Sequence, residues 1–449
     1  MNYHAYEFAH TLISPMRFAV KGMRLSLQSP LNPFGMTPWG RSMAAGCKVF
    51  ERMTKRYDKP EFGLDNTVIN GVQVPVEEEV VLSKPFCDLL HFKRDLSAIG
   101  DSNDPKVLIV APMSGHYATL LRGTVEAMLP EHDTYITDWT DARDVPLVDG
   151  EFSLNSFIDY IIEFLQILGP NLHVIAVCQP SVPVLAATAV MADNDDPLQP
   201  ASLTLMGGPV DTRRNPTQVN ELAAKKPIEW FENNVISQVP FPNAGMMRKV
   251  YPGFVQLTGF MTMNLDRHRN AHVELFNNLV KGDCDSVEQH TTFYDEYLAV
   301  MDLSAEFYLQ TVAEVFQNHT LPDGRMRHKN KPVNCAKIEK TALMTVEGEL
   351  DDICGLGQTE AAHDLTPKIP DDEHYHYVQK GVGHYGIFNG RRWRTEIQPR
   401  IAEMIRTVEF KRRTGGAARL ENRSTGKYRK LKKGTQPNAN EPVKTDAAE

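Results

Sequence analysis

The sequence feature that most constrains the fold of this chain is a cysteine placed between two short apolar segments. Residues 173–177 are typical of a buried strand, Cys178 falls in a turn, and residues 181–191 are apolar enough for a buried helix. This order is that of a nucleophile elbow, in which a strained turn between strand and helix exposes one side chain at the sheet edge. The pattern therefore predicts Cys178 as a thiol nucleophile.

The segment departs from the usual Gly-x-nucleophile-x-Gly pattern of an elbow. Ala176 stands in place of the first glycine and Pro180 in place of the second. Alanine is nearly as small as glycine, and proline suits the first turn of a helix, where no amide hydrogen bond is lost. The alternative is a buried structural cysteine, because a free cysteine also packs as a small hydrophobe. The segment alone leaves both interpretations open.

Two later strand ends carry the residue types that a thiol nucleophile needs. Enzymes with this elbow place an acid and then a base downstream of the nucleophile. Residues 341–347 predict a buried strand that is followed by Asp351 and Asp352, and residues 374–378 predict another, followed by His384 in a glycine-rich loop. Because the carboxyl ends of parallel strands share one edge, these side chains are expected to meet there. The order predicts an aspartate as acid and His384 as base.

An early strand end offers the backbone amides that would stabilise an oxyanion. Residues 107–111 predict a buried strand, and the loop after it contains Met113, Ser114 and Gly115. The glycine allows the backbone to approach a substrate closely. We expect one amide from Met113 or Ser114 and a second from Gln179, the residue after the cysteine.

Four motifs together resemble the intracellular poly(3-hydroxybutyrate) (PHB) depolymerases, which are α/β-hydrolase relatives of the polyhydroxyalkanoate synthases. The motifs are residues 138–147, the elbow, residues 348–353 and residues 383–386. The resemblance extends from about residue 1 to 410. It implies Cys178 as nucleophile, Asp351 as acid and His384 as base, with Asp352 as the alternative acid. It also implies an α/β fold with a mainly parallel sheet, helices on both faces and a helical lid insertion.

The resemblance further implies cleavage of ester bonds in amorphous storage polyester. A thioester on the cysteine would be released by water, or by coenzyme A as a thiol acceptor, to give 3-hydroxybutyrate monomers or oligomers. No resident cofactor and no metal are expected. Three alternatives stay open: a synthase-like acyltransferase, a thiol hydrolase of small esters, and a non-enzymatic granule-associated protein. Synthases keep a glycine after the cysteine turn, so Pro180 favours a depolymerase.

The order of segments predicts four structural units. We expect an N-terminal helical or extended arm over residues 1–84, a hydrolase core over 85–208 and 335–410, a helical lid over 209–334, and a basic, disordered tail over 411–449. Strands and helices alternate in the core, which is typical of a mainly parallel sheet. The lid carries apolar residues that would either grip polyester or form its core; they are Trp230, Phe231, Phe241, Met246, Met247, Phe254, Phe260, Met261 and Met263.

The distribution of charge indicates the kind of binding partner, and the cysteines indicate the cellular compartment. The whole chain has a net charge of −9, but residues 1–56 hold eight Lys/Arg against two Glu, and residues 411–433 hold ten against one. Basic ends on an acidic body suggest an anionic contact, such as a granule coated with phospholipid or protein; nucleic acid is not expected, and a solvated tail is the alternative. Six scattered cysteines, no secretory signal and no apolar run of about 18 residues predict a cytoplasmic protein without a membrane span.

Three further features receive no catalytic role. Residues 381–386 match a dinucleotide-binding fingerprint but lack the strand–helix–strand context that this fingerprint requires. His374 and His376 share one face of a predicted strand, yet the sequence offers no third metal ligand at a suitable spacing. His116 is expected to be a loop residue outside the triad.

Overall fold

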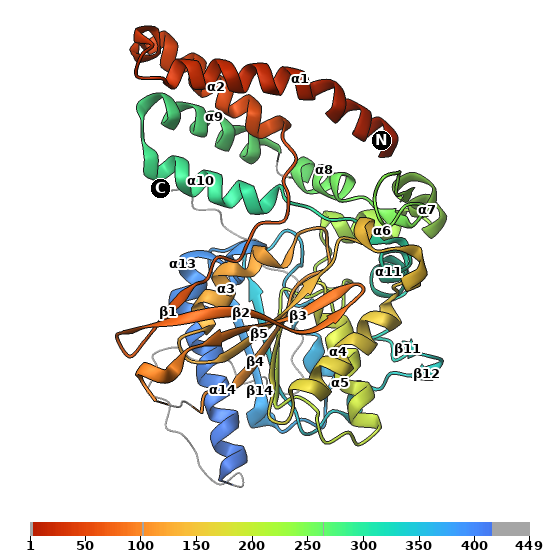
Figure 1. Ribbon diagram of the computed structural model, residues 1–449. Coiled ribbons are helices and arrows are strands. Elements are labelled where there is room, and N and C mark those ends of the chain that lie inside the picture. The colour runs from red at the N-terminus through yellow and green to blue at the C-terminus, as the bar shows by residue number, and fades with distance from the viewer. Residues whose placement is uncertain (1–2, 101–102, 264, 415–449) are drawn as a thin grey trace, which may run out of the picture.

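A nine-stranded sheet forms the centre of the protein (Figure 1). The computed structural model describes residues 3–100, 103–263 and 265–414. The strands follow the order β1-β2-β3-β5-β4-β6-β7-β13-β14 across the sheet. Their bounds are β1 (Asn66–Ile69), β2 (Val72–Lys84), β3 (Cys87–Arg94), β4 (Lys106–Val110), β5 (Asp133–Trp139), β6 (His173–Val177), β7 (Ser202–Met206), β13 (Ala342–Gly348) and β14 (His374–Gln379).

The sheet is mainly parallel, as the sequence predicts. Strands β5, β4, β6, β7, β13 and β14 run parallel to their neighbours, whereas β1, β2 and β3 add an antiparallel edge. Every residue of β6, β7 and β13 is buried. Continuously apolar strands are expected where helices cover both faces of a parallel sheet. The predicted α/β class with a mainly parallel sheet is therefore confirmed.

Helices cover both faces of this sheet. Figure 1 shows α4 and α5 on one side and α3, α13 and α14 on the other. Helix α4 begins with a capping box in which Ser153 and Ser156 satisfy each other's backbone amides. Helix α5 is buried on nearly all sides, which explains its lack of polar residues. The bounds are α3 (Arg122–Met128), α4 (Leu154–Leu168), α5 (Ser181–Asp193), α12 (Ala362–Leu365), α13 (Gly390–Arg392) and α14 (Gln398–Arg413).

The N-terminal region differs from the arm expected over residues 1–84. Its first part is a helical hairpin, α1 (Tyr3–Gln28) and α2 (Pro38–Thr54). Its second part belongs to the central sheet, because β2 pairs antiparallel with β3 along most of its length. The sheet therefore begins at Asn66 rather than at residue 85. Most residues of β2 are exposed or half-buried, so this strand near the edge of the sheet lacks the apolar run that marks the inner strands.

The insertion between β7 and β13 is largely helical but less regular than expected. Within the helical lid expected over 209–334, α6 and α7 are separated at Pro227, and a short strand lies between α10 and α11. Its elements are α6 (Gln218–Lys225), α7 (Ile228–Val235), β8 (Ser237–Gln238), β9 (Lys249–Tyr251), α8 (Gly253–Met263), α9 (Leu265–Lys281), α10 (Cys284–Tyr297), β10 (Leu303–Ser304), α11 (Ala305–Thr311), β11 (Arg327–His328) and β12 (Lys331–Pro332).

The N-terminal hairpin is attached to this insertion. Arg52 forms an ion pair with Asp295 at 3.1 Å, and the Tyr3 hydroxyl donates a hydrogen bond of 2.7 Å to the buried Asp302. The ring of Tyr6 stacks on Phe254 at a centroid distance of 4.1 Å. Figure 1 shows α1, α2, α9 and α10 as a helical layer away from the sheet. The hairpin and the insertion are therefore packed together.

Two further expectations concern a membrane span and the C-terminal tail. Within residues 3–100, 103–263 and 265–414, no helix is both long and apolar enough to cross a bilayer. Helix α14 extends into the first residues of the segment 411–449 that was expected to be a disordered tail. Residues 415–449 of that basic segment lie outside the described residues.

Candidate active site

Cys178 occupies a strained turn between β6 and α5. Its φ angle is +66°, in the left-handed region that residues other than glycine rarely adopt. The Cys178 amide donates a hydrogen bond of 2.7 Å to the Met206 carbonyl, and α5 begins at Ser181. The cysteine is half-buried and lines a cavity; Cys354 lines the same cavity but is buried. This is the geometry of an elbow, and it separates Cys178 from a cysteine that only fills the core.

Glycines on the neighbouring strand explain how the elbow tolerates Ala176 and Pro180. A Cβ atom on Gly208 would lie only 2.0 Å from the Ser181 hydroxyl oxygen. A Cβ atom on Gly207, whose φ is +55°, would lie 3.1 Å from the His384 ring. The two glycines that follow β7 therefore allow Ser181 and the His384 ring to approach the backbone closely. Neither glycine is adjacent to the cysteine in the sequence, so the elbow pattern gave no signal for them.

His384 and Asp351 form a buried hydrogen-bonded pair. His384 Nδ1 lies 2.7 Å from Asp351 Oδ2, and the Asp351 side chain has no exposed area. Asp351 Oδ1 accepts hydrogen bonds from the amides of Ile353 and Cys354, at 2.9 and 2.8 Å. Because an ionised carboxylate only accepts hydrogen bonds, Nδ1 must carry a proton. The other ring nitrogen, Nε2, is then the one available to Cys178.

The electrostatics of this pair favour a charged imidazole. Burial opposes a charge on His384, but the Asp351 carboxylate and the Cys178 thiolate outweigh it, and hydrogen bonds from both add to their effect. Together they hold the pKa of the imidazole well above its usual value. The amino end of α5 also favours negative charge at the sulfur. The site can therefore hold a thiolate beside an imidazolium.

The structure distinguishes the two aspartates that the sequence left open. Asp351 carries the hydrogen bond to His384, whereas Asp352 is exposed. The fold thus brings Cys178, Asp351 and His384 together from the ends of three parallel strands. Asp352 does not share the contact with the imidazole.

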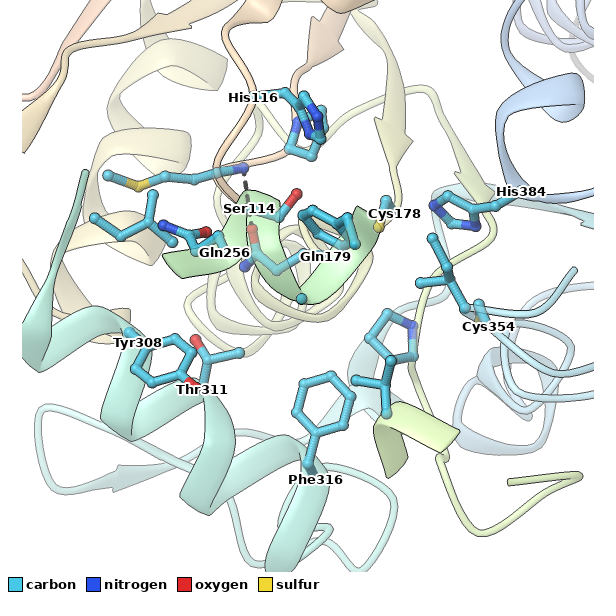
Figure 2. A pocket seen from close by; sticks show the side chains of 18 of the residues that line it. Ser114, His116, Cys178, Gln179, Gln256, Tyr308, Thr311, Phe316, Cys354 and His384 are labelled. Carbon is cyan, nitrogen blue, oxygen red and sulfur yellow. Dashed lines mark hydrogen bonds between the residues drawn. The ribbon is translucent and has the colours of Figure 1, made fainter. Parts of the chain in front are cut away.

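The three residues expected to supply oxyanion donors lie beside the cysteine. Met113, Ser114 and Gln179 line the same cavity as Cys178 (Figure 2). The Met113 amide already donates a hydrogen bond of 3.4 Å to the Gln179 side-chain oxygen. Of the expected donors, the amides of Ser114 and Gln179 therefore fit an incoming oxyanion better than that of Met113.

A cavity of about 530 Å³ opens between the sheet edge and the insertion. Its far wall is mainly apolar and comes from α6, α7, α8 and α11, with Phe231 and Phe260 among the lining residues. Phe241, Met246 and Met247 are instead exposed to solvent, and Phe254 packs against the N-terminal hairpin. Only part of the apolar set in the insertion therefore faces the cavity.

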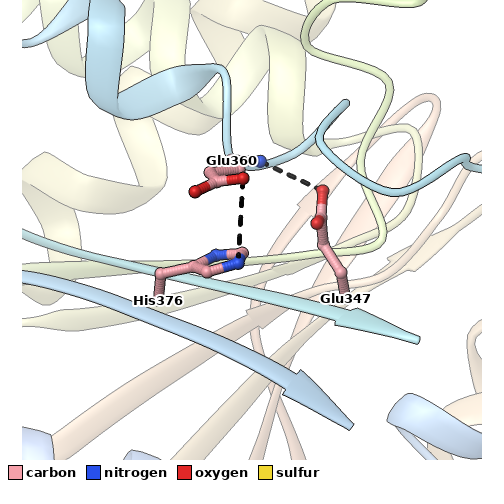
Figure 3. A group of neighbouring side chains, drawn as sticks. All are labelled: Glu347, Glu360 and His376. Atoms are coloured by element: carbon pink, nitrogen blue, oxygen red, sulfur yellow. Dashed lines mark hydrogen bonds and ion pairs between the residues drawn. The ribbon is translucent and has the colours of Figure 1, made fainter. Parts of the chain in front are cut away.

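A second cluster holds the loop that bears Asp351 (Figure 3). Glu347 accepts hydrogen bonds from the amides of Gly357, Thr359 and Glu360 at 2.9, 2.7 and 3.1 Å. His376 Nε2 lies 3.9 Å from the Glu360 carboxylate. The fold thus gives His376 two acidic neighbours that the sequence did not indicate. Since three backbone amides occupy the Glu347 carboxylate, we assign this cluster to fastening the loop rather than to a metal ion.

Comparisons with solved structures find similar chains at low sequence identity. One is a membrane phospholipase A described as a bacterial virulence factor, with 12% identity, coverage of 74% of this chain and 87% of that one, and a TM-score of 0.41. Another is a thermophilic esterase from Thermogutta terrifontis, with 12% identity, coverage of 77% and 97%, and a TM-score of 0.38. A search of curated proteins by sequence found no match.

A family model described as "PHB de-polymerase C-terminus" matches residues 207–409. The matched segment begins where β7 ends, spans the helical insertion, and includes both Asp351 and His384. Cys178 lies upstream of it, on the same sheet edge. Residues 207–409, which carry Asp351 and His384, are therefore similar to the C-terminal part of PHB depolymerases, and the chain folds as an α/β protein with a mainly parallel sheet.

Proposed function

We propose that this protein hydrolyses the ester bonds of amorphous PHB through a covalent thioester on Cys178. The observation that carries the proposal is the contact of the strained Cys178 thiol with an imidazole that the buried Asp351 orients. Such a set supplies a nucleophile, a proton carrier and a group that fixes the tautomer. The match to the PHB depolymerase family supports polyester as the substrate.

The reaction follows from these positions. Cys178 Sγ attacks the ester carbonyl carbon, and the amides of Gln179 and Ser114 stabilise the oxyanion. The carbon–oxygen ester bond breaks, and the departing alkoxide takes the proton from His384 Nε2. His384 then takes a proton from water, the hydroxide attacks the thioester, and the carbon–sulfur bond breaks. The products are a carboxylic acid and the restored thiolate.

No step of this sequence requires a resident cofactor or a metal ion. Coenzyme A is the alternative acceptor in the second half, where its thiol would replace water and give an acyl-CoA. We propose water as the acceptor and a location on storage granules in the cytoplasm, where a free thiol stays reduced. The basic segment 411–433 is proposed to contact an anionic granule coat.

An exposed apolar surface on the N-terminal hairpin supports a particulate substrate. Phe18, Leu31 and Trp39 are 81%, 93% and 79% exposed. Phe8 and Leu12 are also exposed and lie four residues apart, so they share one face of α1. Exposed apolar patches of this kind on a soluble domain mark interaction surfaces. We propose that this hairpin meets the uncharged surface of the polymer.

The Cys178→Ala variant should abolish release of 3-hydroxybutyrate from native amorphous granules, because no other group supplies the attacking atom. Cys178→Ser should retain at most a small residual rate, since a hydroxyl is a far weaker nucleophile than a thiolate. The matched control is Cys284→Ala, which removes an exposed thiol on α10 and should leave the rate unchanged. Full activity of Cys178→Ala would rule out the thioester route. Polymer formation from 3-hydroxybutyryl-CoA by the wild type would favour a synthase instead.

Asp351→Asn should lower kcat by about 10²- to 10⁴-fold, because the imidazole loses the group that sets its tautomer. Asp351 also raises the pKa of His384, so its loss should shift the alkaline limb of the kcat/KM profile to lower pH. Asp352→Asn should change neither value. The measurement is a pH profile on soluble 3-hydroxybutyrate oligomers. Equal effects of the two variants would contradict the assignment of Asp351.

Replacing Phe18 and Trp39 together by serine should reduce binding to amorphous granules by at least about tenfold, because burial of each side chain contributes roughly 1.5–3 kcal/mol. Hydrolysis of soluble oligomers should be unchanged, since the hairpin lies outside the cavity. The control replaces Lys21 and Arg41 on the same hairpin by glutamine; any loss it causes should disappear at high salt. Co-sedimentation with granules measures the binding of both double variants. Unchanged binding of the serine variant would rule out the hairpin as the contact.

A further inference from the structure

His116 lines the cavity beside Cys178 but takes no part in the steps above. It lies in the loop between β4 and α3, is 2% exposed, and contacts the Tyr297 carbonyl through Nε2 at 3.1 Å. A carbonyl only accepts hydrogen bonds, so Nε2 must carry a proton. Burial lowers the pKa of His116 to about 4, so the ring is neutral at pH 7 and Nδ1 is left as a hydrogen-bond acceptor.

The surroundings of His116 leave that acceptor without a partner. The ring packs against Phe260, Tyr297 and Tyr385 at centroid distances of 5.4, 5.3 and 6.4 Å. Among the described residues, none forms a hydrogen bond with Nδ1. Because His116 lines the cavity, a ligand bound there can supply a donor to this acceptor. Figure 2 shows Cys178 between the His384 ring and the loop that carries Ser114 and His116.

Gln179 offers a hydrogen-bond donor in the same cavity. Its side-chain oxygen accepts the Met113 amide, which fixes the orientation of the side chain. Its Nε2 atom is buried and has no partner among the described residues. The wall near the nucleophile therefore offers one unpaired acceptor and one unpaired donor. A hydroxyl group can satisfy both, whereas an ester oxygen can satisfy only the donor.

We infer that His116 and Gln179 form a subsite for the free 3-hydroxyl of a terminal 3-hydroxyacyl unit. The inference rests on the proposed function and makes it more specific. In a linear polyester every internal hydroxyl is esterified, so only the unit at the hydroxyl end presents a donor. Binding that hydroxyl places the carbonyl of the same unit toward Cys178. The subsite therefore favours cleavage from the hydroxyl end, one 3-hydroxyacyl unit at a time.

Two substitutions of His116 test the role of the Nδ1 acceptor separately from that of the hydrogen bond between Nε2 and the Tyr297 carbonyl. In His116→Gln the amide can replace Nε2 and keep the bond to Tyr297, but the Nδ1 acceptor is lost. In His116→Asn the side-chain oxygen can occupy the place of Nδ1. The substrates are a 3-hydroxybutyrate trimer with a free hydroxyl and the same trimer with that hydroxyl O-methylated.

The wild type should prefer the free trimer by at least about tenfold in kcat/KM, mainly through KM, because the blocked trimer has no hydroxyl proton to donate to His116 Nδ1. His116→Asn should retain most of this preference, and His116→Gln should bring the ratio close to one. An unchanged ratio in His116→Gln would overturn the subsite. An equal loss of kcat on both trimers would also overturn it, because Nδ1 would then hold the hydrolytic water.

Binding without turnover separates this inference from the proposed function. In the Cys178→Ala background, the Kd of the free trimer should rise by about tenfold on adding His116→Gln but only slightly on adding His116→Asn. Thermal unfolding of each variant checks that the cavity is intact. If the wild type fails to hydrolyse either trimer but this binding pattern holds, the proposed function fails and the subsite stands. If hydrolysis proceeds and the Kd values do not differ, only the subsite fails.

Discussion

The buried hydrogen bond between Asp351 and His384 is the contact on which the rest of the site depends. At 2.7 Å, with both side chains almost fully enclosed, it fixes which imidazole nitrogen carries a proton and directs the other toward Cys178. The same carboxylate supports the positive charge that a neighbouring thiolate requires. Without it, burial would favour a neutral His384 imidazole, which could not supply the positive charge beside the sulfur.

That contact is held by groups distant in sequence. Glu347 binds three amides of the loop that follows β13, and the Thr359 hydroxyl donates to the Gly208 carbonyl and accepts from its amide. Gly207 leaves room for the imidazole. The loops after β7, β13 and β14 are thus packed as one unit. The position of the imidazole over the cysteine is a property of this unit and not of any single loop.

The sequence predicted the inner strands of the sheet and the three residues of the candidate triad. Inner strands such as β6 and β7 are short, largely apolar and buried throughout, so the sequence predicted their place in a parallel sheet. The order of cysteine, acid and base followed from the strand ends. Strand β2 was missed because its solvent-facing glutamates hide a strand near the edge of the sheet. Asp351 and Asp352 are adjacent, and only the folded loop decides which one turns inward. Glu347 and the glycines after β7 act through contacts across the sheet, for which a linear pattern gives no signal.

The central claim is that the sulfur of Cys178 carries the acyl group during turnover. The most direct test is peptide mass spectrometry of enzyme that has been acid-quenched while it degrades a 3-hydroxybutyrate oligomer. We expect a 3-hydroxybutyryl adduct on the peptide that contains Cys178, removable by hydroxylamine as a thioester should be. An unmodified Cys178 throughout turnover, or an adduct on a different side chain, would contradict the claim.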